Sequence, residues 1–168
     1  MAEDIINRVS NSKLKLVDLE DYYPDGKRLV LDIKNWLYEE LVLREKEFRQ
    51  FVNDHDWSQY KDAYVVINCS SDAIIPDWAY MLITTQLQPY AKFVASGDLQ
   101  SLDSLLFTEI INNLDVSQYK DAPVIIKGCA TKPVPVDALI QLTNKLKPIA
   151  KSIMFGEACS SVPLYKRK

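Results

Sequence analysis

Apolar residues in this chain fall into short runs, and stretches of helical spacing lie between them. The runs at residues 63–68 and 122–127 are nearly continuous. This pattern is typical of strands that are covered on both faces, as parallel strands are. Shorter runs at residues 92–95 and 151–155 predict a second strand after each of the first two. The pattern therefore predicts two pairs of buried strands.

A helix is predicted between the strands of each pair. Apolar residues recur every three or four positions after Pro76 and after Pro135, and proline is well tolerated in the first turn of a helix. The next proline along the chain cannot continue either helix, so the helices are expected to end near Gln88 and Lys147. Each pair of strands is thus predicted to form one β-α-β module.

The two modules are copies of one another. Residues 56–98 and 115–157 align at a constant offset of 59 without a gap, and 17 of the 43 positions are identical. An amphipathic helix precedes each copy, so the repeats extend over about residues 43–98 and 102–157. These helices are expected to pack on the sheet through two matching sets of apolar residues: Phe48, Phe51 and Val52, then Phe107, Ile110 and Ile111.

The predicted fold class is α/β. The turn signal Tyr-Pro-Asp-Gly at residues 23–26 lies between segments 14–19 and 27–34, which predicts an N-terminal β-hairpin. Successive β-α-β crossovers in one sheet are parallel and right-handed. We therefore expect a single domain over residues 1–168, with one mainly parallel sheet, flanking helices, the internal duplication and the hairpin.

Composition and charge disfavour several classes of function. A net charge of −3 argues against a dedicated nucleic-acid binder, which usually presents a basic face. No apolar run approaches the roughly 18 residues of a membrane span. The acidic start of the chain lacks the features of a signal peptide, and three widely spaced cysteines fit a reducing compartment. We expect a cytoplasmic protein that binds neither nucleic acid nor a membrane.

The candidate chemistry lies at the cysteines. Cys69, Cys129 and Cys159 each follow a predicted strand, and binding sites in parallel sheets lie beyond the carboxyl ends of the strands. Cys69 and Cys129 also precede helices, whose positive dipole ends stabilise thiolate. If the strands are neighbours, the thiolates are placed to hold zinc or an iron–sulfur cluster, with Asp72, Glu157 or a guest molecule as a fourth ligand.

Two other interpretations of the cysteines stay open. Free cysteine is among the most buried residue types, so all three can be packing residues without chemistry. Alternatively, one of them is the reactive thiol of an enzyme. His55, the only histidine, stands at a predicted helix end, where a cation is favourable, and nothing in the sequence pairs it with a cysteine.

Several strings of the sequence are specific enough to indicate a family: LEDYYP (19–24), LREKEFR (43–49), HDWSQY (55–60), IPDWAYML (75–82) and GEACSSVPLY (156–165). They resemble the bacterial family called domain of unknown function 2480, and the resemblance covers essentially the whole chain. It implies a single domain and no established activity. It also implies a gene neighbourhood shared with the sulfur-mobilisation (SUF) iron–sulfur assembly system, and hence an accessory role in iron–sulfur metabolism.

Three functions follow, in order of preference. The first is a non-enzymatic accessory protein that binds protein partners, such as iron–sulfur assembly factors. The second is a metal or iron–sulfur cluster carrier that uses Cys69, Cys129 and Cys159. The third is a thiol-dependent enzyme that uses one of these cysteines.

Overall fold

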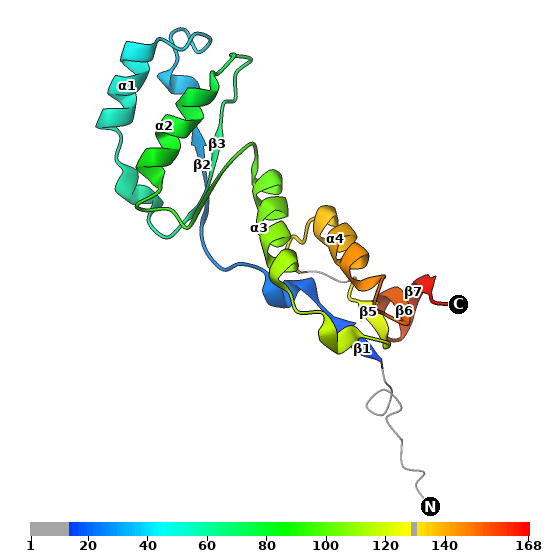
Figure 1. Cartoon of the computed structure of the whole chain (residues 1–168). Helices are drawn as coiled ribbons and strands as arrows, with labels where there is room; N and C mark the ends of the chain where they lie inside the picture. The colour runs from blue at the N-terminus through cyan, green and yellow to red at the C-terminus, as the bar shows by residue number, and fades with distance from the viewer. Residues whose placement is uncertain (1–13, 129–130) are drawn as a thin grey trace, which may run out of the picture. The chain divides into compact units, whose positions relative to one another are not determined.

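The computed structural model describes residues 14–128 and 131–168 of the chain. The chain divides into two compact units. Unit 1 comprises residues 1–23 and 106–168, and unit 2 comprises residues 24–105. Each unit combines a small sheet with helices on it (Figure 1). Whether the two units fold as one domain stays a prediction.

Unit 2 is built on a three-stranded parallel sheet whose strands lie in chain order: β2 (Arg28–Asp32), β3 (Tyr64–Asn68) and β4 (Phe93–Ser96). Two helices make the crossovers, α1 (Glu45–Asp54) before β3 and α2 (Asp77–Leu87) before β4. Right-handed crossovers that proceed in one direction place both helices on the same face of a sheet. Figure 1 shows α1 and α2 side by side on one side of β2 and β3.

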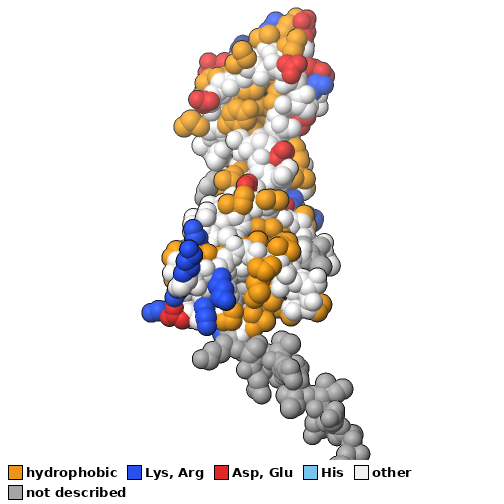
Figure 2. Space-filling view, turned by 90° about the vertical axis from the view of Figure 1, so that its right-hand side faces the viewer, with side chains coloured by type: hydrophobic (Ala, Val, Ile, Leu, Met, Phe, Trp, Pro, Cys, Tyr) orange, Lys and Arg blue, Asp and Glu red, His pale blue; other side chains and the backbone are white. Residues whose placement is uncertain are grey.

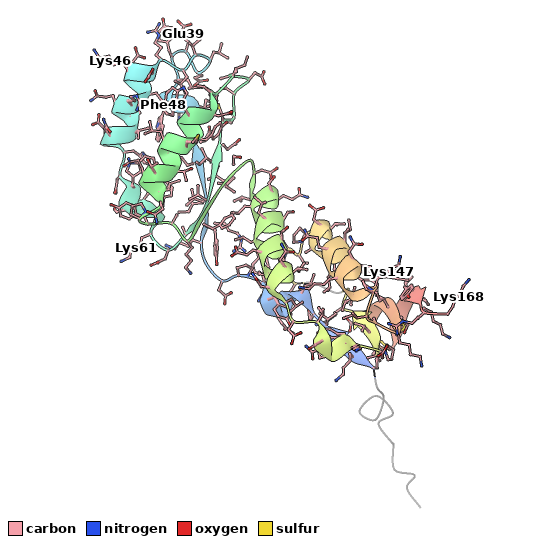
Figure 3. The ribbon with its side chains drawn as sticks, in the orientation of Figure 1. Glu39, Lys46, Phe48, Lys61, Lys147 and Lys168 are labelled. Atoms are coloured by element: carbon pink, nitrogen blue, oxygen red, sulfur yellow. The ribbon has the colours of Figure 1, made fainter. Side chains whose placement is uncertain are left out.

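The core of unit 2 lies between this helix layer and the sheet. Phe48 and Val52 of α1 pack with Ile83 of α2 and Val65 of β3, and none of these side chains is more than 1% exposed. Figure 3 shows Phe48 between α1 and α2. The prediction that Phe51 also packs on the sheet is wrong, because its side chain is 44% exposed.

One residue of β2, Arg28, contacts the first turns of α3 (Leu99–Asn113). There the Arg28 guanidinium donates to the Asp103 carboxylate at 2.7 Å, and both side chains are largely buried. Figure 2 shows hydrophobic side chains gathered on the side of unit 2 that faces the viewer. Val30 of β2 contributes an exposed apolar side chain to the sheet.

Unit 1 repeats this arrangement and adds one strand. Its strands lie in the order β1 (Lys15–Val17), β5 (Pro123–Ile126), β6 (Ser152–Glu157) and β7 (Ser160–Lys166). The first three are parallel, and β7 is antiparallel to β6. The second half of α3 and all of α4 (Val136–Leu146) cover the sheet, with Phe107, Ile111 and Leu142 buried in the core. The predicted contact of Ile110 is only partial, since that side chain is half-buried.

Short 3-10 turns complete the described chain: η1 (Leu19–Tyr22), η2 (Lys34–Trp36), η3 (Trp57–Tyr60) and η4 (Ser117–Tyr119). The longest of the described helices, α3, has 15 residues. No helix in the described part of the chain is long and apolar enough to cross a membrane.

The internal repeat is confirmed down to the register of the strands. Val65 pairs with Val94 in unit 2, and the residues 59 positions later, Val124 and Ile153, pair in unit 1. Helices α2 and α4 also begin and end 59 residues apart, each directly after a proline as predicted. The strand-terminal glycines match as well, with φ of 120° at Gly97 and 126° at Gly156.

Two predictions about the sheet are wrong. The modules do not share one sheet, because β3–β4 and β5–β6 belong to different sheets. The N-terminal hairpin does not form either, since β1 pairs with β5 and β2 pairs with β3. Each of these segments instead supplies the first parallel strand of one unit. The antiparallel strand β7 was not predicted at all.

Candidate functional site

A pocket of about 490 Å³ opens at the carboxyl end of the unit 2 sheet. This is where parallel sheets place their binding sites. Its wall is formed by the ends of β3 and β4, the loop after β3 and the first turn of α2. The polar side chains that line it are Asn68, Cys69, Ser71, Asp77, Tyr80 and Ser96. The pocket is therefore a polar cavity at the edge of a parallel sheet.

Cys69 stands at the boundary between this pocket and the core. It is half-buried and packs against the apolar cluster under the sheet. Its Sγ lies 3.3 Å from the Ser71 hydroxyl, within hydrogen-bond distance for sulfur. The thiol thus has one polar neighbour and faces an open cavity.

Asp32, at the end of β2, holds the loop after β3 in place. Its carboxylate accepts hydrogen bonds from the Ser70 N–H at 3.1 Å and from the Lys34 N–H at 3.0 Å. Burial acts to raise the pKa of Asp32, but the hydrogen bonds from Ser70 and Lys34 outweigh it, and the pKa lies below its ordinary value. The carboxylate is therefore ionised and anchors Ser70, the residue after Cys69.

The charge around the pocket is mixed. The Lys34 ammonium is 2.9 Å from the Glu40 carboxylate, and this hydrogen bond raises the pKa of Lys34. Burial raises the pKa of Tyr80, and electrostatic interactions with Cys69 and Asp77 add to the effect. Tyr80 consequently stays a neutral hydroxyl that can donate or accept a hydrogen bond.

The corresponding place in unit 1 is filled. Gly128 stands at the repeat position of Cys69, and Phe155 stands at that of Ser96. A Cβ on Gly128 would lie only 2.9 Å from Cζ of Phe155, so the aromatic ring takes up the room that a side chain would need. Among the described residues, an aromatic ring thus occupies in unit 1 space that stays open beside Cys69 in unit 2.

The predicted ligands are divided between the two units. Cys69 belongs to unit 2, whereas Cys159 is exposed in the turn between β6 and β7 of unit 1. Asp72 is exposed and does not line the Cys69 pocket. Glu157 belongs to unit 1, and its Oε1 is buried without a hydrogen-bond partner among the described residues. Cys129 lies outside the residues that the structure describes.

A metal site is consequently not visible in the described part of the chain. No group of three or more histidine, cysteine, aspartate or glutamate side chains is placed there to hold an ion. The proposed three-cysteine site depends on Cys129, so it stays a prediction.

His55 has a different role from the one predicted. It caps the end of α1, but burial lowers its pKa and outweighs the attraction of Asp56, so the ring is neutral at pH 7. Its Nε2 lies 3.0 Å from the Tyr60 hydroxyl, and the ring packs edge-on against Trp36 and Trp57. His55 belongs to an aromatic cluster of unit 2 rather than to a charged helix end.

The sequence contained one overlooked signal for the site. Val17-Asp18-Leu19 and Leu31-Asp32-Ile33 have the same pattern, and Val17 and Leu31 pair with equivalent residues of the two repeats. Asp32 is the last residue of β2 and Asp18 directly follows β1, and Asp18 accepts a hydrogen bond from Lys127 Nζ at 2.7 Å. A comparison of these two short segments predicts two equivalent strands in place of the hairpin. It also indicates Asp32 as a residue that supports the site.

Residues 3–167 match the family described as protein of unknown function (DUF2480). The chain belongs to this family. The match covers nearly all of the chain, as the resemblance in the sequence implied. No curated protein and no solved structure matches this DUF2480 chain.

Proposed function

We propose that this DUF2480 protein is a binding protein whose ligand is a small polar molecule held in the Cys69 pocket. The observation that carries the proposal is the contrast between the two repeats, since Phe155 fills in unit 1 the place that stays open in unit 2. A volume of about 490 Å³ lies within the range of small-molecule sites.

The lining of the pocket indicates the chemistry of the ligand. Asn68, Ser71 and Tyr80 offer both donors and acceptors of hydrogen bonds, while Asp77 adds a carboxylate. A ligand that matches this lining carries its own hydrogen-bond donors and acceptors. It is not purely anionic, because the Asp77 carboxylate would repel it. The Cys69 thiol lies beside such a ligand.

The wider role is part of the same proposal. A cytoplasmic location, protein partners among the iron–sulfur assembly factors and an accessory role in iron–sulfur metabolism rest on the family resemblance and on composition. The two alternatives, a carrier of zinc or an iron–sulfur cluster and a thiol-dependent enzyme, are separated from the binding protein by the experiment below.

The test converts the unit 2 pocket into its unit 1 counterpart. The double variant Cys69→Gly/Ser96→Phe introduces the residues that unit 1 carries at Gly128 and Phe155. A library of small polar metabolites is screened by ligand-observed NMR against the wild-type chain and this variant. We expect ligands that bind the wild type and are lost in the variant. Cys159→Ser, which alters an exposed turn, is the matched control and keeps the binding.

Other outcomes contradict the proposal in distinct ways. Ligands that bind both proteins equally place the site elsewhere. Stoichiometric zinc or iron in anaerobically purified protein supports the carrier, and its loss in Cys69→Ser, Cys129→Ser and Cys159→Ser would identify the ligands. Turnover of a bound ligand that Cys69→Ser abolishes supports the thiol enzyme.

A further inference from the structure

The two repeats differ in how their last parallel strand is covered. In unit 1, β6 pairs on its outer side with β7, from Ser152 opposite Lys166 to Glu157 opposite Ser160. In unit 2, the equivalent strand β4 pairs within the described residues with β3 alone. An open strand edge is a template for pairing with another chain.

The outer edge of β4 has free backbone groups at defined positions. The Lys92 N–H donates to the Ala63 carbonyl, so the backbone of Lys92 faces the neighbouring strand. Because these groups alternate in direction along a strand, the N–H and C=O groups of Phe93 and Ala95 face outward. Two outward residues are thus in position to pair with a further strand.

A groove of about 400 Å³ runs beside this edge, between α2 and β4. It is lined by Met81 and Thr84 of α2 and by Val94 of β4, and Met81 is 68% exposed. In unit 1 the equivalent groove lies beside α4 and is bordered by Leu164 of β7. The groove of unit 2 has no such strand beside it among the described residues.

We propose that the outer edge of β4 is an interface between two copies of this chain. The β4 strands pair antiparallel across a twofold axis and join the two unit 2 sheets into one sheet of six strands. Antiparallel pairing is the arrangement that β7 adopts on β6, and a twofold axis between identical strands produces it directly.

The residues along β4 favour one register. With Ala95 opposite Ala95 of the second copy, two outward-facing residues exchange both hydrogen bonds. Phe93 then lies across from Gly97, whose N–H already donates to the Ile67 carbonyl, so the added hydrogen bonds centre on Ala95. Lys92 and Asp98 flank the strand, so opposite charges stand at each end of the short interface.

The helices fit the same arrangement. In the paired sheet, the axis of α2 and the axis of its copy are two strand spacings apart. Neighbouring strands are about 4.8 Å apart, so the two helix axes are about 10 Å apart. Packed helices lie about 8–10 Å apart, and α2 therefore meets its copy across the twofold axis. The two grooves merge at this contact, and the exposed Met81 side chains fill them.

Sedimentation velocity on the full chain tests the interface. We expect the wild type to form a dimer as the chain concentration is raised to about 100 μM. Met81→Glu is expected to raise the dissociation constant of this dimer more than tenfold. Ala95→Pro, which removes an outward N–H without touching the pairing to β3, has the same expected effect. Neither Met81 nor Ala95 lines the Cys69 pocket.

The repeat supplies the matched control. Ile140 stands at the position of Met81 on α4, is 53% exposed and lies beside the edge that β7 covers. Ile140→Glu is therefore expected to leave the dimer intact. Urea unfolding of each variant confirms that it folds. A monomeric wild type overturns the proposal. So does a dimer that is as stable in Met81→Glu and Ala95→Pro as in the wild type. A monomer that binds a synthetic β7 peptide would assign the edge to an extended peptide instead.

Discussion

Gly128 and Phe155 are in such close contact that a Cβ on the glycine would lie 2.9 Å from Cζ of the ring. The same two repeat positions in unit 2 carry Cys69 and Ser96, which line an open pocket. One architecture thus appears twice in the chain, and its described residues place an aromatic ring in unit 1 where unit 2 has an open pocket.

The first prediction compares the two equivalent positions directly. Gly128→Ala forces the added methyl group against the Phe155 ring, and overpacking of this kind costs about 1–3 kcal/mol. Cys69→Ala removes a half-buried thiol that borders an open pocket, and we expect a loss below about 1 kcal/mol. Urea unfolding measures both. Equal losses would show that the two cavities are packed alike.

The second prediction concerns the helix before the first repeat. Phe48 is fully buried in the core of unit 2, so Phe48→Ala is expected to lower the free energy of unfolding by about 3–5 kcal/mol. Phe51 on the same helix is 44% exposed, and Phe51→Ala should cost less than about 1 kcal/mol. Denaturant unfolding of the two variants side by side checks the orientation of α1. A larger loss for Phe51→Ala would mean that the helix presents its other face.

The third prediction follows from the protonation of His55. Burial lowers the pKa of His55 below its ordinary value of 6.5, so the unfolded chain binds more protons than the folded chain near pH 6. The stability that this group contributes is present above pH 6.5 and is lost as the pH falls through the lower, folded pKa. His55→Gln should flatten the pH dependence of the unfolding free energy in this range. An unchanged slope would assign that dependence to other groups.

The repeat made much of the fold predictable from the sequence. Helices α2 and α4 lie within a residue or two of their predicted limits, and each begins after its proline, because proline and apolar periodicity act locally. The partners of the strands were not predictable in this way. Lys15 of β1 pairs with Val124, far along the chain, and no local pattern specifies which of two similar strands it joins.

Strand β7 and the pocket escaped prediction for related reasons. Most side chains of β7 are exposed, so the alternation of apolar and polar residues that marks a strand is missing there. Pro163 within β7 also argues against a strand. Cys69 and Cys159 follow strands as predicted, but a site depends on which strand ends meet. Ser96 and Tyr80 meet Cys69, and Asp32 meets Ser70, because β2, β3 and β4 lie side by side in one sheet.

Protection of Cys69 from alkylation tests the central claim most directly. The chain is treated with N-ethylmaleimide with and without a ligand found in the NMR screen, and the modification of each cysteine is followed by peptide mass spectrometry. We expect the ligand to slow the alkylation of Cys69, which lines the pocket, and to leave the rate at the exposed Cys159 unchanged. Equal rates at Cys69 with and without a saturating ligand would contradict the assignment of the pocket as the binding site.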